Sequence, residues 1–238
     1  CKALLICFFA VVIVGGCSAF GVISGIIASA PSIEDIDATP TGYLTTVLDN
    51  QGNQTATLVA SGSNRKYVTI NEIPINLQHA FVAIEDERFY DHNGIDLQGI
   101  LRAGLKGVAS GFHFSEGAST ITQQLLKNTV FTQWTSEQSM ADKFERKFQE
   151  QYLALQLEKV VDKDWILENY LNAINLGQNT LGVGVASERY FGKDVSELTL
   201  SECAVLAAIT QSPSYYNPIT HPDHNKERRQ KVLNNMLD

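Results

Sequence analysis

The feature that most constrains this chain is a run of residues without any charge, from Ala3 to Ala30. The run is longer than the roughly 20 residues that a helix needs to cross the hydrocarbon core of a bilayer. One cation, Lys2, precedes it, and acidic residues follow it, beginning with Glu34. This charge bias favours a cytoplasmic N-terminus. We therefore expect residues 1–30 to form a single-pass anchor in the cell membrane, with the rest of the chain extracytoplasmic.

Two other targeting signals share part of this pattern. A cleaved signal peptide has an apolar core of only about 7–15 residues, which is shorter than this run. The segment Val14–Cys17 loosely resembles a lipoprotein cleavage site, but Cys17 is followed by further apolar residues rather than by a polar tether. Both comparisons favour an uncleaved anchor.

Length, charge and cysteine content narrow the class of protein. The chain has 238 residues, enough for one large domain or two small ones. Its formal net charge of −8 argues against nucleic acid as a partner. The charge does not exclude an anionic ligand, because local cations decide whether such a ligand binds. The cysteine and histidine spacings predict neither a disulfide nor a metal site.

The remainder of the chain is predicted to be mainly α-helical. Residues 31–70 are expected to form an acidic linker and a small β-hairpin, because Thr-, Val- and Leu-rich stretches at 43–48 and 54–59 flank a turn-forming segment. Residues 71–238 are expected to form one helical domain. Its predicted helices cover residues 74–85, 96–108, 119–128, 142–160, 163–175, 199–209 and a final helix beyond 217.

Two apolar patterns in this domain predict contacts. The helix over 142–160 carries an apolar stripe, as a packed helix face does. The stripe consists of Phe144, Phe148, Tyr152 and Leu155. The glycine-rich segment 107–117 carries Phe112 and Phe114, and we expect a mobile loop whose apolar tip reaches a membrane surface.

Glu85 is the candidate general base. It is expected at the C-terminal end of the helix that begins near Pro74. A glycosyl transfer with inversion needs a base to take the proton of the attacking sugar hydroxyl, and a carboxylate beside an apolar wall can serve. The alternative is an ordinary surface glutamate. His92 is either a second base or, the favoured interpretation, a histidine that orients the Glu85 loop.

Polar side chains on the helix predicted over 119–128 could bind the hydroxyl and acetamido groups of a sugar. They are Ser119, Gln123, Gln124 and Asn128. The alternative is a polar helix face in water.

A group of cations could hold a diphosphate and stabilise its charge as it leaves. The group consists of Lys127, Lys143, Arg146 and Lys147. The alternative is a surface pair between Arg146 and Glu150, four residues apart and worth about 0.3–0.5 kcal/mol. Such a pair would also keep Glu150 ionised.

The order and spacing of these groups resemble the peptidoglycan glycosyltransferase domain, glycosyltransferase family 51. The family's first motif, E-D-x-x-F-x-x-H-x-G, is matched over Glu85–Gly94. The second, G-x-S-T-x-x-Q-Q-x-x-K-N, is matched over Gly117–Asn128. The third, R-K-x-x-E, is matched over Arg146–Glu150, and the fourth, K-x-x-I-L-E-x-Y-L-N, over Lys163–Asn172. The match covers about residues 70–235.

This resemblance implies a lysozyme-like, two-lobed helical fold and an enzyme that polymerises lipid II into glycan strands. The 4-hydroxyl of the acceptor's GlcNAc attacks the anomeric carbon of the donor's MurNAc, undecaprenyl diphosphate leaves, and the new bond is β-1,4. By motif position Glu85 is the general base and Glu150 is a second acidic residue that positions substrate or a cation. The implied substrate-binding positions are Asp86, His92, Ser119, Thr120, Gln123, Gln124, Lys127, Asn128, Arg146 and Lys147.

The resemblance also implies partners. These are lipid II, the growing glycan strand, the membrane, and a transpeptidase domain beyond residue 238, as in class A penicillin-binding proteins. No cofactor is obligatory, but family members are often helped by Mg2+ or Mn2+ near the diphosphate.

Two positions depart from the family pattern. Many members have an arginine eight residues before the third-motif glutamate, where it contacts the donor diphosphate. Here that position is Asp142, and the preceding loop is longer than usual. Lys143 is the candidate substitute. Gly184 stands where the family usually has Glu or Gln, so a local hydrogen bond of the family is not expected here.

Two other functions are open on the sequence alone. A lytic enzyme of the same shape would also rely on a glutamate, but it would cleave finished glycan and would not need Lys127, Arg146 and Lys147. A non-catalytic membrane-anchored module that binds cell-wall partners would not need Glu85. The full set of polar motif residues favours the glycosyltransferase.

Overall fold

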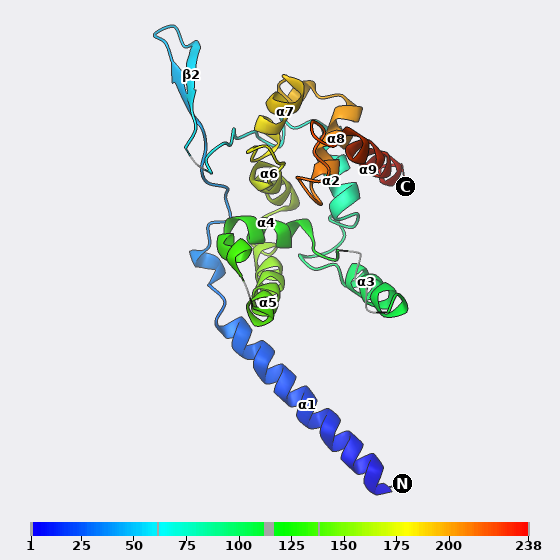
Figure 1. Ribbon diagram of the computed structural model, residues 1–238. Helices are drawn as coiled ribbons and strands as arrows, with labels where there is room; N and C mark the ends of the chain where they lie inside the picture. Colours follow the sequence, from blue (N-terminus) through cyan, green and yellow to red (C-terminus); the bar gives the residue numbers. More distant parts are fainter. Residues whose placement is uncertain (1, 61, 112–116, 138, 238) are drawn as a thin grey trace.

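A long apolar helix opens the chain. The computed structural model describes residues 2–60, 62–111, 117–137 and 139–237 (Figure 1). Helix α1, Lys2–Ala28, extends away from the other elements (Figure 1). At 1.5 Å per residue its 27 residues are about 40 Å long. The span Phe8–Asp35 has a mean hydropathy of 2.2, and its most apolar part is not buried inside the protein. The predicted apolar helix is therefore confirmed.

The predicted β-hairpin is also confirmed. Strands β1, Thr45–Leu48, and β2, Gln54–Leu58, are antiparallel, with Thr45 opposite Leu58 and a bulge between Val47 and Leu48. Both strands are exposed along their whole length, and the hairpin projects away from the helices (Figure 1).

One group of helices packs around a central apolar helix. Helix α8, Leu200–Ile209, is buried from Cys203 to its end. A helix that is apolar all round has to be covered on every side. Helices α2 (Ile75–Glu85), α9 (Pro222–Asn235) and α7 (Val183–Phe191) pack against it.

Helix α4, Ile121–Thr129, is the centre of a second group of helices. It packs on α6, Lys163–Ala173, and on α5, Met140–Leu157. Helix α3, Leu97–Ala109, lies at the edge of the molecule (Figure 1). Short 3-10 turns complete the described elements, namely η1 (Ile33–Asp35), η2 (Thr132–Ser136) and η3 (Val195–Glu197). The mainly helical class is confirmed, and the likeness to lysozyme stays a prediction.

Two boundaries differ from the sequence-based expectation. Helix α3 continues to Ala109, so the glycine-rich loop begins later than Gly107. Phe112 and Phe114 lie outside the described residues. Helix α4 begins at Ile121 rather than at Ser119, because the Thr120 side chain caps its N-terminus.

The apolar stripe predicted on α5 is packed only in part, since Tyr152 lies against the core and Phe148 is half-buried. Phe144 is 54% exposed and Leu155 is 38% exposed. The buried face instead holds Gln149, Glu150, Leu153, Ala154 and Leu157. The cause is electrostatic, since the Glu150 carboxylate has two cationic partners and can therefore be buried.

The anchor helix is attached to α5. The Gln149 amide donates hydrogen bonds to the Ile26 carbonyl oxygen at 3.4 Å and to the Ser29 hydroxyl at 3.1 Å. Ser29 in turn donates to the Glu145 carboxylate at 3.2 Å. The end of α1 is thus part of the packed structure.

The structure explains the departure at Gly184. A Cβ at this position would lie 2.7 Å from the Lys66 carbonyl oxygen and 3.1 Å from a Val68 methyl carbon. The extended chain around Lys66 therefore occupies the space that a glutamate or glutamine side chain would need.

Candidate active site

Glu85 is the last residue of α2, as predicted. Its side chain lines two cavities, one on either side of it. Gln124 Nε2 donates to Glu85 Oε2 at 2.9 Å, and the Thr210 hydroxyl donates to Oε1. These two donors fix the orientation of the Glu85 carboxylate. Thr210 follows α8 and was missed by sequence reasoning, because nothing local links it to Glu85.

A buried aromatic pair lies next to this carboxylate. Tyr170 is fully buried, and its ring meets Phe81 edge to face with 6.2 Å between centroids. The Tyr170 hydroxyl donates to Gln124 Oε1 at 3.5 Å. Burial, followed by the charges of Glu85 and Asp86, raises the pKa of Tyr170 well above its usual value. Tyr170 therefore stays protonated and keeps Gln124 oriented towards Glu85.

Asp86 and His92 hold the loop after Glu85 in place. His92 Nε2 lies 3.0 Å from both Asp86 oxygens, and the Gly94 backbone N–H donates to His92 Nδ1 at 3.2 Å. Because Nδ1 accepts a hydrogen bond, Nε2 is the ring nitrogen that donates to Asp86. The Ile121 N–H also donates to Asp86 at 2.9 Å. This geometry supports the orienting role of His92 rather than that of a second base.

The start of α4 is tied to the same loop. The Thr120 hydroxyl donates to the Gly94 carbonyl oxygen at 2.7 Å, and Gln123 Nε2 donates to it at 3.3 Å. Both side chains are 1% exposed. Gln123 Oε1 is buried without a partner among the described residues, although Gln123 lines one of the cavities. It is thus an acceptor without a donor.

The α4–α5 cavity, of about 480 Å³, contains the predicted cations Lys127, Arg146 and Lys147. Lys147 Nζ donates to Ser119 Oγ at 2.7 Å and pairs with Glu150 at 2.8 Å. Arg146 Nη1 pairs with the other Glu150 oxygen. Glu150 is completely buried, so these two cations compensate its charge and it holds them at the cavity wall.

Two residues outside the family motifs contact the same cations. Lys127 Nζ lies 3.7 Å from the centre of the Trp134 ring. Arg146 Nε donates to Glu137 at 2.7 Å. Burial lowers the pKa of Lys127. Burial also opposes the charge of Arg146, but the carboxylates of Glu137 and Glu150 outweigh it and raise the pKa of Arg146.

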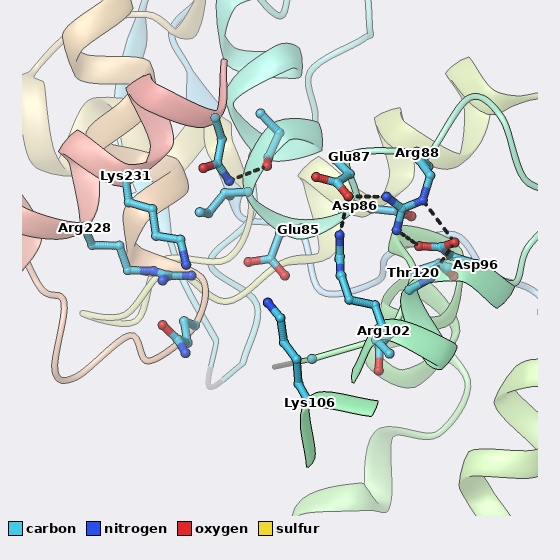
Figure 2. Close-up of a pocket in the computed structure, with 18 residues that line it drawn as sticks. Glu85, Asp86, Glu87, Arg88, Asp96, Arg102, Lys106, Thr120, Arg228 and Lys231 are labelled. Atoms are coloured by element: carbon cyan, nitrogen blue, oxygen red, sulfur yellow. Dashed lines mark hydrogen bonds and ion pairs between the residues drawn. The ribbon is translucent and has the colours of Figure 1, made fainter. Parts of the chain in front are cut away.

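The α3–α9 cavity, of about 280 Å³, lies on the other side of Glu85. Arg228 and Lys231 from α9 and Lys106 from α3 are directed towards it (Figure 2). Arg102 also lines this cavity. Sequence reasoning missed these four cations. The three-residue spacing of Arg228 and Lys231, which places both on one helix face, was the available signal.

Besides His92, two predicted site residues lie outside the two cavities. Lys143 is exposed on α5, and Asn128 is half-buried near the end of α4. Neither lines the two cavities. The role of Lys143 in place of the missing arginine therefore stays a prediction.

The nearby carboxylates do not fit a bound Mg2+ or Mn2+ ion. Glu150 is engaged by two cations, and Glu85 by two hydrogen-bond donors. Within the described ranges, no group of three or more histidine, cysteine, aspartate or glutamate residues is placed to hold a metal ion. The reaction derived below therefore involves no step at a metal.

Relatives of known name share most of this chain. Penicillin-binding protein 1F of Bacillus subtilis (strain 168) is 46% identical over 193 residues, which are 81% of this chain and 26% of the relative. Penicillin-binding protein 1A of Clostridium perfringens (strain 13 / Type A) is 45% identical over 213 residues, 88% of this chain and 30% of the relative. The chain thus spans less than a third of the length of these relatives.

A solved structure and a family profile also align with this chain. The crystal structure of penicillin-binding protein 1A from Haemophilus influenzae aligns with a TM-score of 0.44 and 24% identity, over 84% of this chain and 18% of that one. The profile of the family described as Transglycosylase matches residues 51–237, which include both cavities and Glu85. The chain belongs to the transglycosylase family.

Proposed function

We propose that this domain is a peptidoglycan glycosyltransferase that polymerises lipid II into β-1,4-linked glycan strands. The observation that carries the proposal is the place of Glu85, on the wall common to two cavities that both contain cations. Transfer between two lipid diphosphates needs a base between two anion sites. A lytic enzyme acting on finished glycan needs neither anion site.

The α4–α5 cavity suits the donor. Lys127, Arg146 and Lys147 can hold its diphosphate and stabilise the charge that develops as the bond breaks. Gln123 Oε1, which has no partner among the described residues, can accept a hydrogen bond from a sugar hydroxyl or acetamido group. Glu150 acts through Arg146 and Lys147 as a positioning residue.

The α3–α9 cavity suits the acceptor lipid II. Arg228 and Lys231 can bind its diphosphate, and its GlcNAc then extends towards Glu85. Arg228 lines both cavities, so it lies where the two substrates meet.

The reaction follows from this arrangement. Glu85 takes the proton of the GlcNAc 4-hydroxyl while that oxygen attacks the anomeric carbon of the donor's MurNAc. The bond from the anomeric carbon to the diphosphate oxygen breaks, its electron pair leaves with the diphosphate, and the configuration inverts. Thr210 and Gln124 keep the Glu85 carboxylate oriented as a base.

We also propose that the domain is extracytoplasmic and works at the membrane surface. Helix α1 is long and apolar enough to be the anchor. Helix α3 supports a second contact, because one of its faces is apolar and 60–72% exposed. This apolar face consists of Leu97, Leu101, Leu105 and Val108. Helices α1 and α3 lie at the end of the molecule opposite the hairpin (Figure 1).

In a longer chain, this domain would work beside a transpeptidase domain. The support is the name and length of the relatives, since the matched parts are only 26% and 30% of two penicillin-binding proteins. Covalent labelling of the complete native protein by a fluorescent penicillin, with no label on residues 1–238 alone, would agree with this arrangement.

Polymerisation of purified lipid II tests the function. We expect wild-type chain to give glycan strands on a resolving gel and Glu85→Gln to lose at least about 100-fold in rate, because the base is gone. Glu227→Gln, an exposed change on α9, is the matched control. Polymer from folded Glu85→Gln at the wild-type rate would place the base elsewhere. Cleavage of finished glycan without use of lipid II would favour the lytic enzyme.

A further inference from the structure

The segment between α4 and α5 brings two side chains to the donor-side cations. Trp134, in η2, covers the Lys127 ammonium at 3.7 Å, and Glu137 accepts a hydrogen bond from Arg146 Nε at 2.7 Å. A cation over an indole face and a charge-assisted hydrogen bond are both favourable contacts. The segment therefore engages two cations that the diphosphate also needs.

Glu137 adds a negative charge to a cluster that is already partly compensated. Arg146 lies between the Glu137 and Glu150 carboxylates. The Glu137 and Arg146 side chains are both only 15% exposed, so solvent screens this pair less than a surface pair. The charge of Glu137 also acts on Lys127, where it favours the protonated form. One carboxylate thus makes the electrostatic potential at both cations less positive.

The segment between α4 and α5 does not block the α4–α5 cavity. Lys127 and Arg146 line the α4–α5 cavity, but Trp134 and Glu137 are not among its lining residues. The segment therefore contacts the cations from outside the cavity and leaves the cavity itself open. Glu137 Oε2 is buried without a partner in the described part of the chain, so Glu137 is not fully satisfied by this contact.

We propose that Glu137 is an internal counter-ion that lowers the affinity of the donor-side cations for a diphosphate. Its carboxylate offsets the charge of Arg146, while Trp134 keeps the Lys127 ammonium in place. The effect is a weaker hold on the leaving group, which favours its release after each transfer. This inference rests on the proposed function, because it assumes that the α4–α5 cavity takes a diphosphate.

Glu137→Gln separates charge from position. The amide oxygen can still accept the hydrogen bond from Arg146 Nε, so the side chain stays in place while its charge is lost. We expect the Kd for inorganic pyrophosphate to fall about 3–10-fold at low salt, and the gain to shrink as salt screens the cluster. Titration calorimetry on the full chain in detergent measures both values.

The controls use the same segment and the other cavity. Gln133→Ala changes an exposed neighbour in η2 and should leave the Kd unchanged. Glu137→Asp keeps the charge and should bind pyrophosphate like wild type. Glu137→Ala removes the charge in a second way and should tighten binding. The Glu137→Gln effect should persist in a Lys231→Gln background, which weakens only the α3–α9 cavity.

The outcomes separate this inference from the proposed function. Unchanged or weaker pyrophosphate binding by Glu137→Gln and Glu137→Ala would overturn the counter-ion role. Absence of measurable pyrophosphate binding by wild type and both variants would overturn it as well. Tighter binding by the variants, together with no polymerisation of lipid II by wild type, would support the counter-ion role of Glu137 and contradict the proposed glycosyltransferase function instead.

Discussion

Gly94 shows how one position can hold several parts of the site together. Its carbonyl oxygen accepts from both Thr120 and Gln123, and its N–H donates to His92. Its φ is +91°, and a Cβ would lie 2.5 Å from the Ala154 carbonyl oxygen. Only glycine tolerates this conformation next to another backbone.

We expect Gly94→Ala to lower the free energy of unfolding by about 2 kcal/mol or more, through backbone strain and the clash with Ala154. Thermal and urea unfolding measure this change. Gly104→Ala is the matched control, because Gly104 is inside α3 and nothing lies within 4 Å of its added Cβ. That variant should be neutral or more stable, by up to about 1 kcal/mol. Equal stability of the two variants would contradict the strain argument.

Sequence reasoning located Glu85 but not what holds it. The place of Glu85 followed from local signals, since Pro74 sets the start of α2. Thr210 lies 125 residues away, and only the packing of α8 on α2 brings its hydroxyl to Glu85. Gln123 was predicted to face a sugar, yet its amide nitrogen donates to the Gly94 carbonyl oxygen instead. Tertiary contacts of this kind leave no local pattern.

Helix α8 is held by a charged cap. The Thr199 side chain and Glu202 form a reciprocal capping box, as the T-L-S-E sequence predicts. Lys193 pairs with both Glu202 oxygens, at 2.8 and 3.0 Å. The hydrogen bond from Lys193, followed by the Thr199 backbone, lowers the pKa of Glu202 from 4.5 to about 2.

This cap predicts a loss of stability in acid. Because the pKa of Glu202 is depressed in the folded state, its contribution is present above pH 4.5 and is lost as pH falls from 4.5 towards 2. We expect Glu202→Gln to be less stable than wild type at pH 7 and the difference to shrink below pH 4.5. Urea unfolding at pH 7, 4 and 3 measures it. A difference that is constant with pH would rule out the linkage.

Helices differ in how far their sequence predicts them. The α8 cap could be predicted because all its parts lie within ten residues. The buried face of α5 could not be predicted in this way, because it depends on a contact between distant parts of the chain. Lys147 pairs with the buried Glu150 and also donates to Ser119, which precedes α4. Apolar periodicity alone pointed to Phe144 and Leu155, which are exposed.

The apolar face of α3 predicts a dependence on the bilayer. Replacing Leu101 and Leu105 together by Ser should remove most of this face, because these residues are 67% and 72% exposed. We expect polymerisation to fall several-fold in lipid vesicles and to change little in detergent. The ratio of the two rates is the measurement. Gln98→Ser, an exposed polar change on α3, is the control. Equal losses in both media would assign the face a structural role.

The attachment of α1 to α5 fixes how far the cations of the α4–α5 cavity lie from the membrane. Gln149 touches the end of the membrane-crossing helix that we propose, and the next residue, Glu150, holds Arg146 and Lys147. Gln149, which contacts the membrane helix, and Glu150, which holds the cations, are thus neighbours in the sequence. The cations are therefore held at a fixed distance from the bilayer. A diphosphate head group of a membrane lipid lies at that distance and meets the cations, whereas the same group free in solution is not positioned in this way.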